Sequence, residues 1–138
     1  MMLKSRERSA AVKLEAIERV FAVAEFAVDG TLSAANTQFL DLFGYRLDEI
    51  RGRPHALFCP GGASDPAYRA LWQALARGEP QSGEFRRVAK DGREIWIHGN
   101  VMPLPGRDGR PHSVFEVAAD ISVAKRQSTD SENQIRAI

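Results

Sequence analysis

Cysteine is nearly absent from this sequence: Cys59 is the only one among 138 residues. A single cysteine forms no disulfide within the chain and supplies no multi-cysteine zinc site. Long apolar runs are missing too, and none approaches the roughly 18 residues that a membrane span needs. The first residues carry no apolar signal core followed by a cleavage site. We therefore expect a cytoplasmic protein without a membrane span.

An excess of charge of either sign is also lacking. The chain has 19 basic and 18 acidic residues, a formal net charge of +1. This balance gives no reason to expect nucleic acid or an anionic membrane as a partner. Catalytic motifs such as G-x-S-x-G, the P-loop or H-E-x-x-H do not occur, and we expect no enzyme. The length predicts one domain with a sizeable core.

Strand pairs are indicated by a repeated dipeptide. Asp-Gly stands between apolar runs at Asp29-Gly30, Asp91-Gly92 and Asp108-Gly109. Asp-Gly favours tight hairpins, and we assign these turns to type I′. Three turns predict five strands, two early and three late. In "REIWIHGNV", Ile97 and Gly99 alternate with polar residues and are expected on the core face.

Helices are predicted between the two groups of strands and before the first one. Asn36 and Asp65 are good N-caps for "TQFLDLF" and for "PAYRALWQALA". At the front, Leu14, Ile17 and Phe21 follow one another at spacings of three and four, and Ala24 continues them. This narrow apolar seam predicts an amphipathic flanking helix that ends near residue 24 and packs on another helix or on the outside of a sheet.

The order of these elements resembles the PAS sensory domain. "DGTLSAANTQFLDLFGYRLDEIRGR" is similar to its opening, and "KDGREIWIHGNVMPLPGRDGRPHSVFEVAADIS" to its closing hairpins. The resemblance implies an α+β PAS fold: a five-stranded antiparallel sheet with helices on one face and an N-terminal amphipathic flanking helix. We divide the chain into the flanking helix (1–24), the PAS domain (25–122) and the start of an output or inter-PAS helix (123–138).

The resemblance also implies a role. "YRALWQALARGEPQSGEFRRVAKDG" is similar to the PAS domains at the front of aerotaxis-type and soluble methyl-accepting chemotaxis proteins, and to flavin-binding redox PAS domains. It implies a sensory input module for redox state, oxygen or a small ligand, within a homodimer formed through Leu14, Ile17 and Phe21. "QIRAI" at the end echoes "KLEAI" at 13–17, which favours a second PAS domain or a signalling domain beyond.

Alternative roles stay open. They are a ligandless PAS domain for dimerisation or protein contacts, and the input of a histidine kinase or a cyclic-dinucleotide enzyme. In every case Asp120 and Ser122, in the D-I-S signature, are the expected signalling hinge between the sheet and the output helix.

The candidate cofactor site follows from the same resemblance. Its residues are Trp72, Arg87, Ile97, Gly99 and His55, with Trp72 able to stack on a planar ring. FAD is favoured over haem, because the long helix has no histidine, and a domain without cofactor is the third possibility. Trp72 as plain core filler also stays open.

His55 and Cys59 stand four residues apart, as two potential ligands do on one helical face. Two ligands do not complete a zinc site, and we expect no metal. His55 takes the place of the reactive cysteine of light-oxygen-voltage (LOV) domains, so LOV photochemistry is not expected. We interpret the pair as packed side chains. Glu116 needs a partner, such as Arg87, if its side chain points inward.

Overall fold

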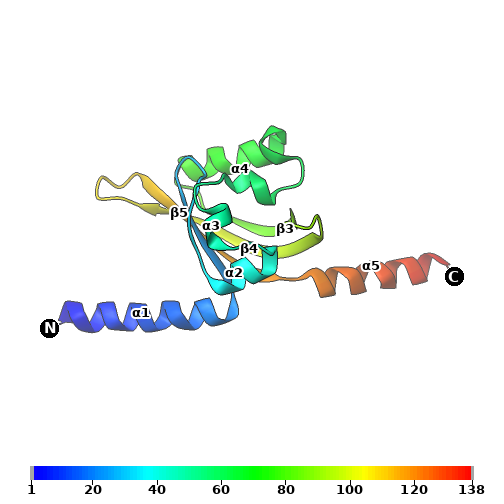
Figure 1. The fold of residues 1–138 in the computed structure, drawn as a ribbon, viewed down its shortest axis with the longest axis horizontal. Coiled ribbons are helices and arrows are strands. Elements are labelled where there is room, and N and C mark those ends of the chain that lie inside the picture. The colour runs from blue at the N-terminus through cyan, green and yellow to red at the C-terminus, as the bar shows by residue number, and fades with distance from the viewer. Residues whose placement is uncertain (1, 138) are drawn as a thin grey trace.

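The computed structural model describes the backbone of residues 2–137 and the side chains of residues 4–129. Figure 1 shows a central sheet with a helix leaving it on each side. In chain order the elements are α1 (Met2–Val20), β1 (Ala22–Ala27), β2 (Leu32–Ala35), α2 (Thr37–Phe43), α3 (Leu47–Ile50), the 3-10 turns η1 (His55–Phe58) and η2 (Gly62–Ser64), α4 (Pro66–Ala76), β3 (Gln81–Val88), β4 (Glu94–Pro105), β5 (Pro111–Asp120) and α5 (Ser122–Ala137).

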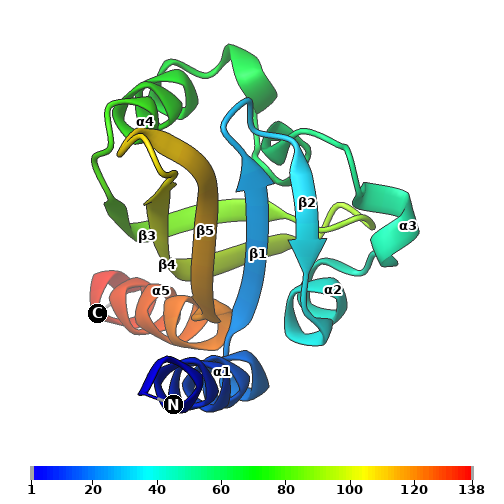
Figure 2. The same cartoon turned by 90° about the vertical axis from the view of Figure 1, so that its left-hand side faces the viewer.

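The five strands form one antiparallel sheet in the order β2-β1-β5-β4-β3. The chain thus places its first hairpin beside its last strand, with Ala24 opposite Glu116. Helices α2, α3 and α4 lie over one face of the sheet (Figure 2). The α+β architecture, the five antiparallel strands and the N-terminal helix predicted from the sequence are confirmed.

The three Asp-Gly turns share one geometry. In each, the glycine has a positive φ, between 80° and 90°, and its N–H donates to the carbonyl three residues earlier. The aspartate Oδ1 accepts the N–H two residues on, as Asp91 does from Arg93 at 3.0 Å. A type I′ turn needs positive φ at both central residues. Among the described residues only glycines have it, so our assignment of turn type is wrong, although the hairpins are where the sequence predicted them.

The helix caps follow the sequence closely. Asn36 precedes α2, and Asp65 precedes α4 and accepts the N–H of Ala67 at 2.9 Å. Gly44 ends α2 in the left-handed region that glycine adopts without a Cβ clash.

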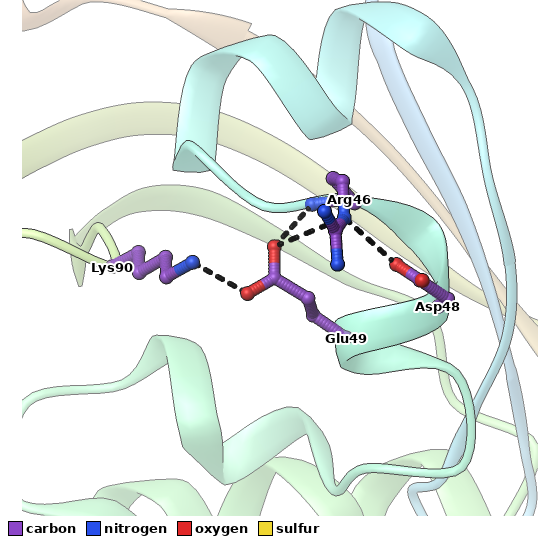
Figure 3. A network of polar contacts seen from close by, with 4 residues as sticks. All are labelled: Arg46, Asp48, Glu49 and Lys90. Carbon is purple, nitrogen blue, oxygen red and sulfur yellow. Dashed lines mark hydrogen bonds and ion pairs between the residues drawn. The ribbon is translucent and has the colours of Figure 1, made fainter.

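Helix α3 is tied to the β3–β4 turn by charged side chains. Figure 3 shows Glu49 accepting the backbone N–H of Arg46 at 2.9 Å and pairing with Lys90. Asp48 accepts from the Arg46 guanidinium at 3.1 Å. The Lys90 and Arg46 contacts hold the pKa of Glu49 below its usual range. Since these groups are exposed, the network orients a short helix more than it stabilises the fold.

The core lies between the sheet and the three helices. Its large buried members are Phe26, Leu32, Phe39, Phe43, Ile50, Phe58, Leu75, Ile95, Ile97 and Val101. The rings of Phe39, Phe43 and Phe58 meet at centroid distances of 4.6 to 5.2 Å. This aromatic cluster anchors α2 and η1 to each other below the sheet.

The flanking helix α1 ends at Val20, before the predicted end near residue 24. Ala24 is a buried residue of β1, and Phe21 is the single residue between helix and strand. The periodic seam therefore covers only Leu14 and Ile17 within the helix, and Phe21 lies outside it. The strand prevails because Val23 and Ala24 pair with β5 on one side and Ala24 with β2 on the other.

Helices α1 and α5 leave the same end of the sheet in opposite directions (Figure 1). No helix in the described part of the chain is long and apolar enough to cross a membrane. The repeat "QIRAI" falls on residues 134–138, whose side chains lie outside the described residues.

Candidate functional site

A buried polar cluster lies on the helix-covered face of the sheet. His55 opens the turn η1, and Glu116 points inward from β5; each is 2 % exposed. The His55 Nε2 is 3.4 Å from Glu116 Oε2, and Cys59 Sγ is 3.6 Å from His55 Nδ1. The three side chains form a line from sulfur to imidazole to carboxylate.

Local structure fixes this cluster. The backbone N–H of His55 donates to Gly30 O in the first hairpin turn at 2.8 Å, which holds η1 against the sheet. Glu116 shares its parity along β5 with the buried residues Val114 and Ala118, so alternation carries it inward. The thiol of Cys59 has a second acceptor, the carbonyl of His55, at 3.6 Å.

The charges of His55 and Glu116 support each other. Burial lowers the pKa of His55, but its contacts with Cys59 and Glu116 outweigh burial and raise that pKa to about 9. Burial raises the pKa of Glu116, and the hydrogen bond and charge of His55 with the charge of Arg87 hold it below its usual value. A buried carboxylate and an imidazolium are thus favoured together.

Aromatic rings enclose the His55 imidazole. Tyr68 stacks on it at a centroid distance of 5.7 Å, and Phe26 and Trp72 meet it edge-on at 5.0 and 5.5 Å. Partial burial raises the pKa of Tyr68 to about 12, so its hydroxyl stays protonated at neutral pH. These rings fill the space between α4 and the sheet.

Arg87 is the buried cation of the site, 7 % exposed on β3. Its guanidinium lies 4.9 Å from the Phe85 ring centroid, and one terminal nitrogen donates to the Arg86 carbonyl at 3.1 Å. Its Nε has no acceptor, and neither has Trp72 Nε1. A buried donor without an acceptor lowers the stability of the fold, so a ligand oxygen that accepts from it would bind favourably at that position.

A pocket of about 290 Å³ opens beside this cluster, between α4 and the edge strand β3. Its walls include Cys59, Tyr68, Phe85, Arg87 and Trp96. The pocket therefore leads from the surface to the sulfur and to the buried guanidinium.

The predicted site residues divide into two groups. His55, Trp72 and Arg87 come together at the polar cluster. Ile97 is fully buried in the core. Gly99 also faces inward, but the Phe85 ring takes the room there, 3.3 Å from where a Cβ would stand. Whether any of these residues holds a cofactor stays a prediction.

Sequence reasoning did not assign Tyr68 to the site, and it interpreted His55 and Cys59 only as packed side chains. For Glu116 the suggested partner was Arg87, whereas the direct contact is with His55 and Arg87 acts through its charge. The spacing of His55 and Cys59 was the available signal, and Glu116 supplies the third member from 57 residues further along the chain.

The predicted hinge lies where β5 meets α5. Asp120 Oδ1 accepts the N–H of Ser122 at 3.0 Å, and Ser122 Oγ accepts the N–H of Trp96 on β4 at 3.0 Å. Lys125, one turn into α5, pairs with Glu84 at 2.6 Å and lies 4.7 Å from the Trp96 ring centroid. The first turn of α5 is thus fastened to the outer side of β3 and β4.

A five-stranded antiparallel sheet with short helices and a longer α4 on one face, a polar cluster beneath them and a helix at each end defines a sensor domain of the PAS type. The comparisons with known proteins identify the family. The model of the PAS fold matches residues 33–118. The chain belongs to the PAS family.

Two similar proteins are a biofilm dispersion protein and an aerotaxis receptor. The biofilm dispersion protein BdlA of Pseudomonas aeruginosa is 36 % identical over 126 residues, which cover 91 % of this chain and 30 % of that protein. The aerotaxis receptor of Escherichia coli is 32 % identical over 79 residues, 57 % of this chain and 15 % of the receptor. The chain spans less than a third of either relative. The sensory role expected from the sequence agrees with both.

Solved structures agree on the fold. A light-oxygen-voltage domain whose mechanism was probed with a flavin analogue superposes with a TM-score of 0.65. The sequences are 24 % identical, and the match covers 83 % of this chain and 88 % of that domain. At this identity the likeness speaks for the fold alone.

Proposed function

We propose that this chain is the sensory input module of a cytoplasmic signalling protein, and in particular of a chemotaxis receptor. The observation that carries the proposal is where the two flanking helices attach. Ala22, the first residue of β1, pairs with Ala118, two residues before the end of β5. Helices α1 and α5 therefore leave from neighbouring strands, so a shift of one strand against the other moves both.

The buried cluster lies close to this attachment point. Glu116 pairs with Ala24, two residues along each strand from the Ala22–Ala118 pair. A change of charge or occupancy at His55 and Glu116 acts directly on β5, and β5 continues into Asp120 and Ser122. A ligand shifts the helices only by as much as its affinity differs between the two arrangements.

A flavin is the ligand that the observations favour over haem. Arg87 Nε and Trp72 Nε1 are buried donors that suit ring carbonyls or phosphate oxygens. Both nitrogens of His55 already have partners at 3.4 and 3.6 Å, which leaves none for a haem iron. Because Phe26 and Trp72 fill the interior, a bound flavin requires the α4 side of the site to move outward.

An absorption spectrum tests the ligand. We expect visible flavin bands in the purified protein, or after reconstitution with FAD, and a weaker affinity in Arg87→Met. Arg93→Met, at an exposed arginine whose guanidinium donates only to the Leu42 carbonyl of α2, is the matched control. A protein that acquires no visible band after reconstitution with FAD, while it remains folded, would refute a flavin role.

Dimerisation is a second function that a specific observation favours. Helix α1 exposes Val12, Leu14, Ile17 and Val20 by 38 to 72 % of their surfaces. An apolar set of this kind on a projecting helix is suited to another helix. We propose a homodimer through α1; the sequence placed it on Leu14, Ile17 and Phe21, of which Leu14 and Ile17 lie within the helix.

The sedimentation behaviour of two variants tests the dimer. Leu14→Gln with Ile17→Gln is expected to give monomers at concentrations where the parent chain is dimeric. Glu15→Gln on the same helix is expected to leave the dimer intact. A double variant that sediments like the parent would remove α1 from the interface.

A further inference from the structure

Cys59 occupies an environment that exceeds what a buried structural cysteine needs. Its sulfur lies beside an imidazole nitrogen, and the other imidazole nitrogen lies beside a carboxylate. A nucleophile beside an imidazole, with a third group that orients the imidazole, is an arrangement in which side chains are activated. Three elements contribute to it: η1 with the residue after it, β5, and α4 through the stacked Tyr68.

The imidazole is oriented by the carboxylate. Glu116 favours the protonated ring, so Nε2–H donates to the carboxylate and Nδ1–H faces the sulfur of Cys59. Cationic and hydrogen-bond donor groups beside sulfur are the surroundings in which cysteines react as thiolates. His55 contacts the sulfur directly, and Glu116 lies behind the imidazole. The other charged and titratable groups of the pocket that the sulfur lines are Asp65, Tyr68, Glu84, Arg86 and Arg87.

The sulfur is also reachable. Cys59 is 8 % exposed and lines the pocket of about 290 Å³ between α4 and β3. Arg87 lines the same pocket and is 7 % exposed, that is, more than nine-tenths buried. Its Nε has no acceptor. An unsatisfied buried guanidinium donor in the wall of the pocket that Cys59 lines is an independent sign that this pocket receives an oxygen-bearing group.

We propose that Cys59 is an oxidation site for small peroxides, activated by His55 and Glu116, with Arg87 as the donor to the oxygen that arrives. His55 and Glu116 are positioning residues in this scheme, and Cys59 is the reacting one. The proposal goes beyond the sensory function above and needs no bound cofactor.

The reaction balances with peroxide as the oxidant. The Cys59 thiol gives its proton to solvent, and the thiolate, held beside the His55 imidazolium, attacks one peroxide oxygen. The S–O bond forms while the O–O bond breaks, so sulfur is oxidised by two electrons and the peroxide is reduced. The departing hydroxide, or alkoxide from an organic peroxide, takes the proton held by His55, and the proton that the thiol gave to solvent replaces it. The products are a sulfenic acid at Cys59 and water or an alcohol.

The test uses the protein as it stands, because its only thiol is the one in question. The reduced protein is treated with hydrogen peroxide in the presence of a cyclic 1,3-diketone that traps sulfenic acids, and the intact mass is followed with time. We expect one adduct per chain, formed about tenfold faster in the folded protein than in the same protein in urea. Cys59→Ser is expected to give no adduct.

Two variants separate activation from simple burial. Glu116→Gln keeps the side-chain shape and removes the charge that favours the His55 imidazolium. Loss of a neighbouring charge changes a pKa by about one unit or more. We therefore expect this variant to slow trapping about tenfold and to move the pH profile of the rate to higher pH. His98→Gln, at an exposed histidine on the outer face, is the matched control and is expected to react like the parent.

The outcomes that would overturn the proposal are definite. A folded protein that reacts more slowly than the urea-unfolded chain at every pH would show that the site only buries the sulfur. A Glu116→Gln protein with the parental rate and pH profile would do the same. If Glu116→Gln does not fold, Arg87→Met takes its place, and an unchanged rate in that variant overturns the proposal. None of these results depends on whether the domain binds a flavin.

Discussion

Asn36 joins three elements through one side chain, and its removal is the sharpest test of how α1 is held. Its Oδ1 accepts the N–H of Val23 and of Phe39, each at 2.9 Å. Its Nδ2 donates to the carbonyls of Glu18 and Phe21, at 3.0 and 2.9 Å. The amide thus links the end of α1 to β1 while it caps α2.

The magnitude follows from these four bonds. A net hydrogen bond contributes about 1 kcal/mol, and the loss of an N-cap costs a similar amount. The site is only partly buried, so water replaces some of what is lost. We expect Asn36→Ala to lower the free energy of unfolding by about 3 kcal/mol, which is ~10 °C in Tm for a domain of this size.

Asn36→Asp divides the effect. It keeps the two acceptor contacts to Val23 and Phe39, but it removes both donors and places a carboxylate against two carbonyl oxygens. We expect it to cost about 2 kcal/mol by urea unfolding. Gln38→Ala, which removes a single exposed contact to the Arg19 carbonyl, is the control and is expected to cost under about 0.5 kcal/mol. An Asn36→Ala cost below about 1 kcal/mol would refute the assignment of this joint.

Three further effects are measurable by urea unfolding. Because contacts with Cys59 and Glu116 raise the pKa of His55 from 6.5 to about 9, its contribution to stability is complete below pH 6.5 and is lost as pH rises through 9. The lowered pKa of Glu116 adds stability that is present above pH 4.5 and is lost on acidification. Glu116→Gln should reduce the alkaline decline, and an undiminished decline would be the contrary result. Gly99→Ala places a Cβ 3.3 Å from Phe85 and should cost about 1 kcal/mol, most of it recovered when Phe85→Leu is added, whereas no recovery would place the strain elsewhere. Gly44→Ala, at φ 78°, should cost about 1 kcal/mol, and no cost would mean that the cap relaxes freely.

Features set by a few adjacent residues were predictable from the sequence. The hairpins followed from Asp-Gly, and the starts of α2 and α4 from Asn36 and Asp65, because turns and caps depend on local backbone geometry. The end of α1 was not predictable in this way. The helical spacing continues through Ala24, but sheet pairing on both sides of that residue and the contacts of Asn36 with Glu18 and Phe21 decide in favour of the strand.

The site was predictable only in part, for a similar reason. The spacing of His55 and Cys59 marked the pair, yet the carboxylate that gives the pair its chemistry comes from a strand 61 residues after His55 in the sequence. An apolar run such as "SVFEVA" does not show which way Glu116 points. The use of Gly99 to seat the Phe85 ring also depends on the β3–β4 register, which places Phe85 opposite Ile97.

The continuous helix of α5 sets a rotational phase for anything fused after it. Its backbone is helical from Ser122 to Ala137, and its first turn is fastened to β4 through Ser122. Each residue inserted behind that anchor turns the following chain by about 100°, and seven residues bring it back to nearly the original orientation. A chimera with an output domain is therefore expected to lose and regain its response with a heptad rhythm as the joint is lengthened.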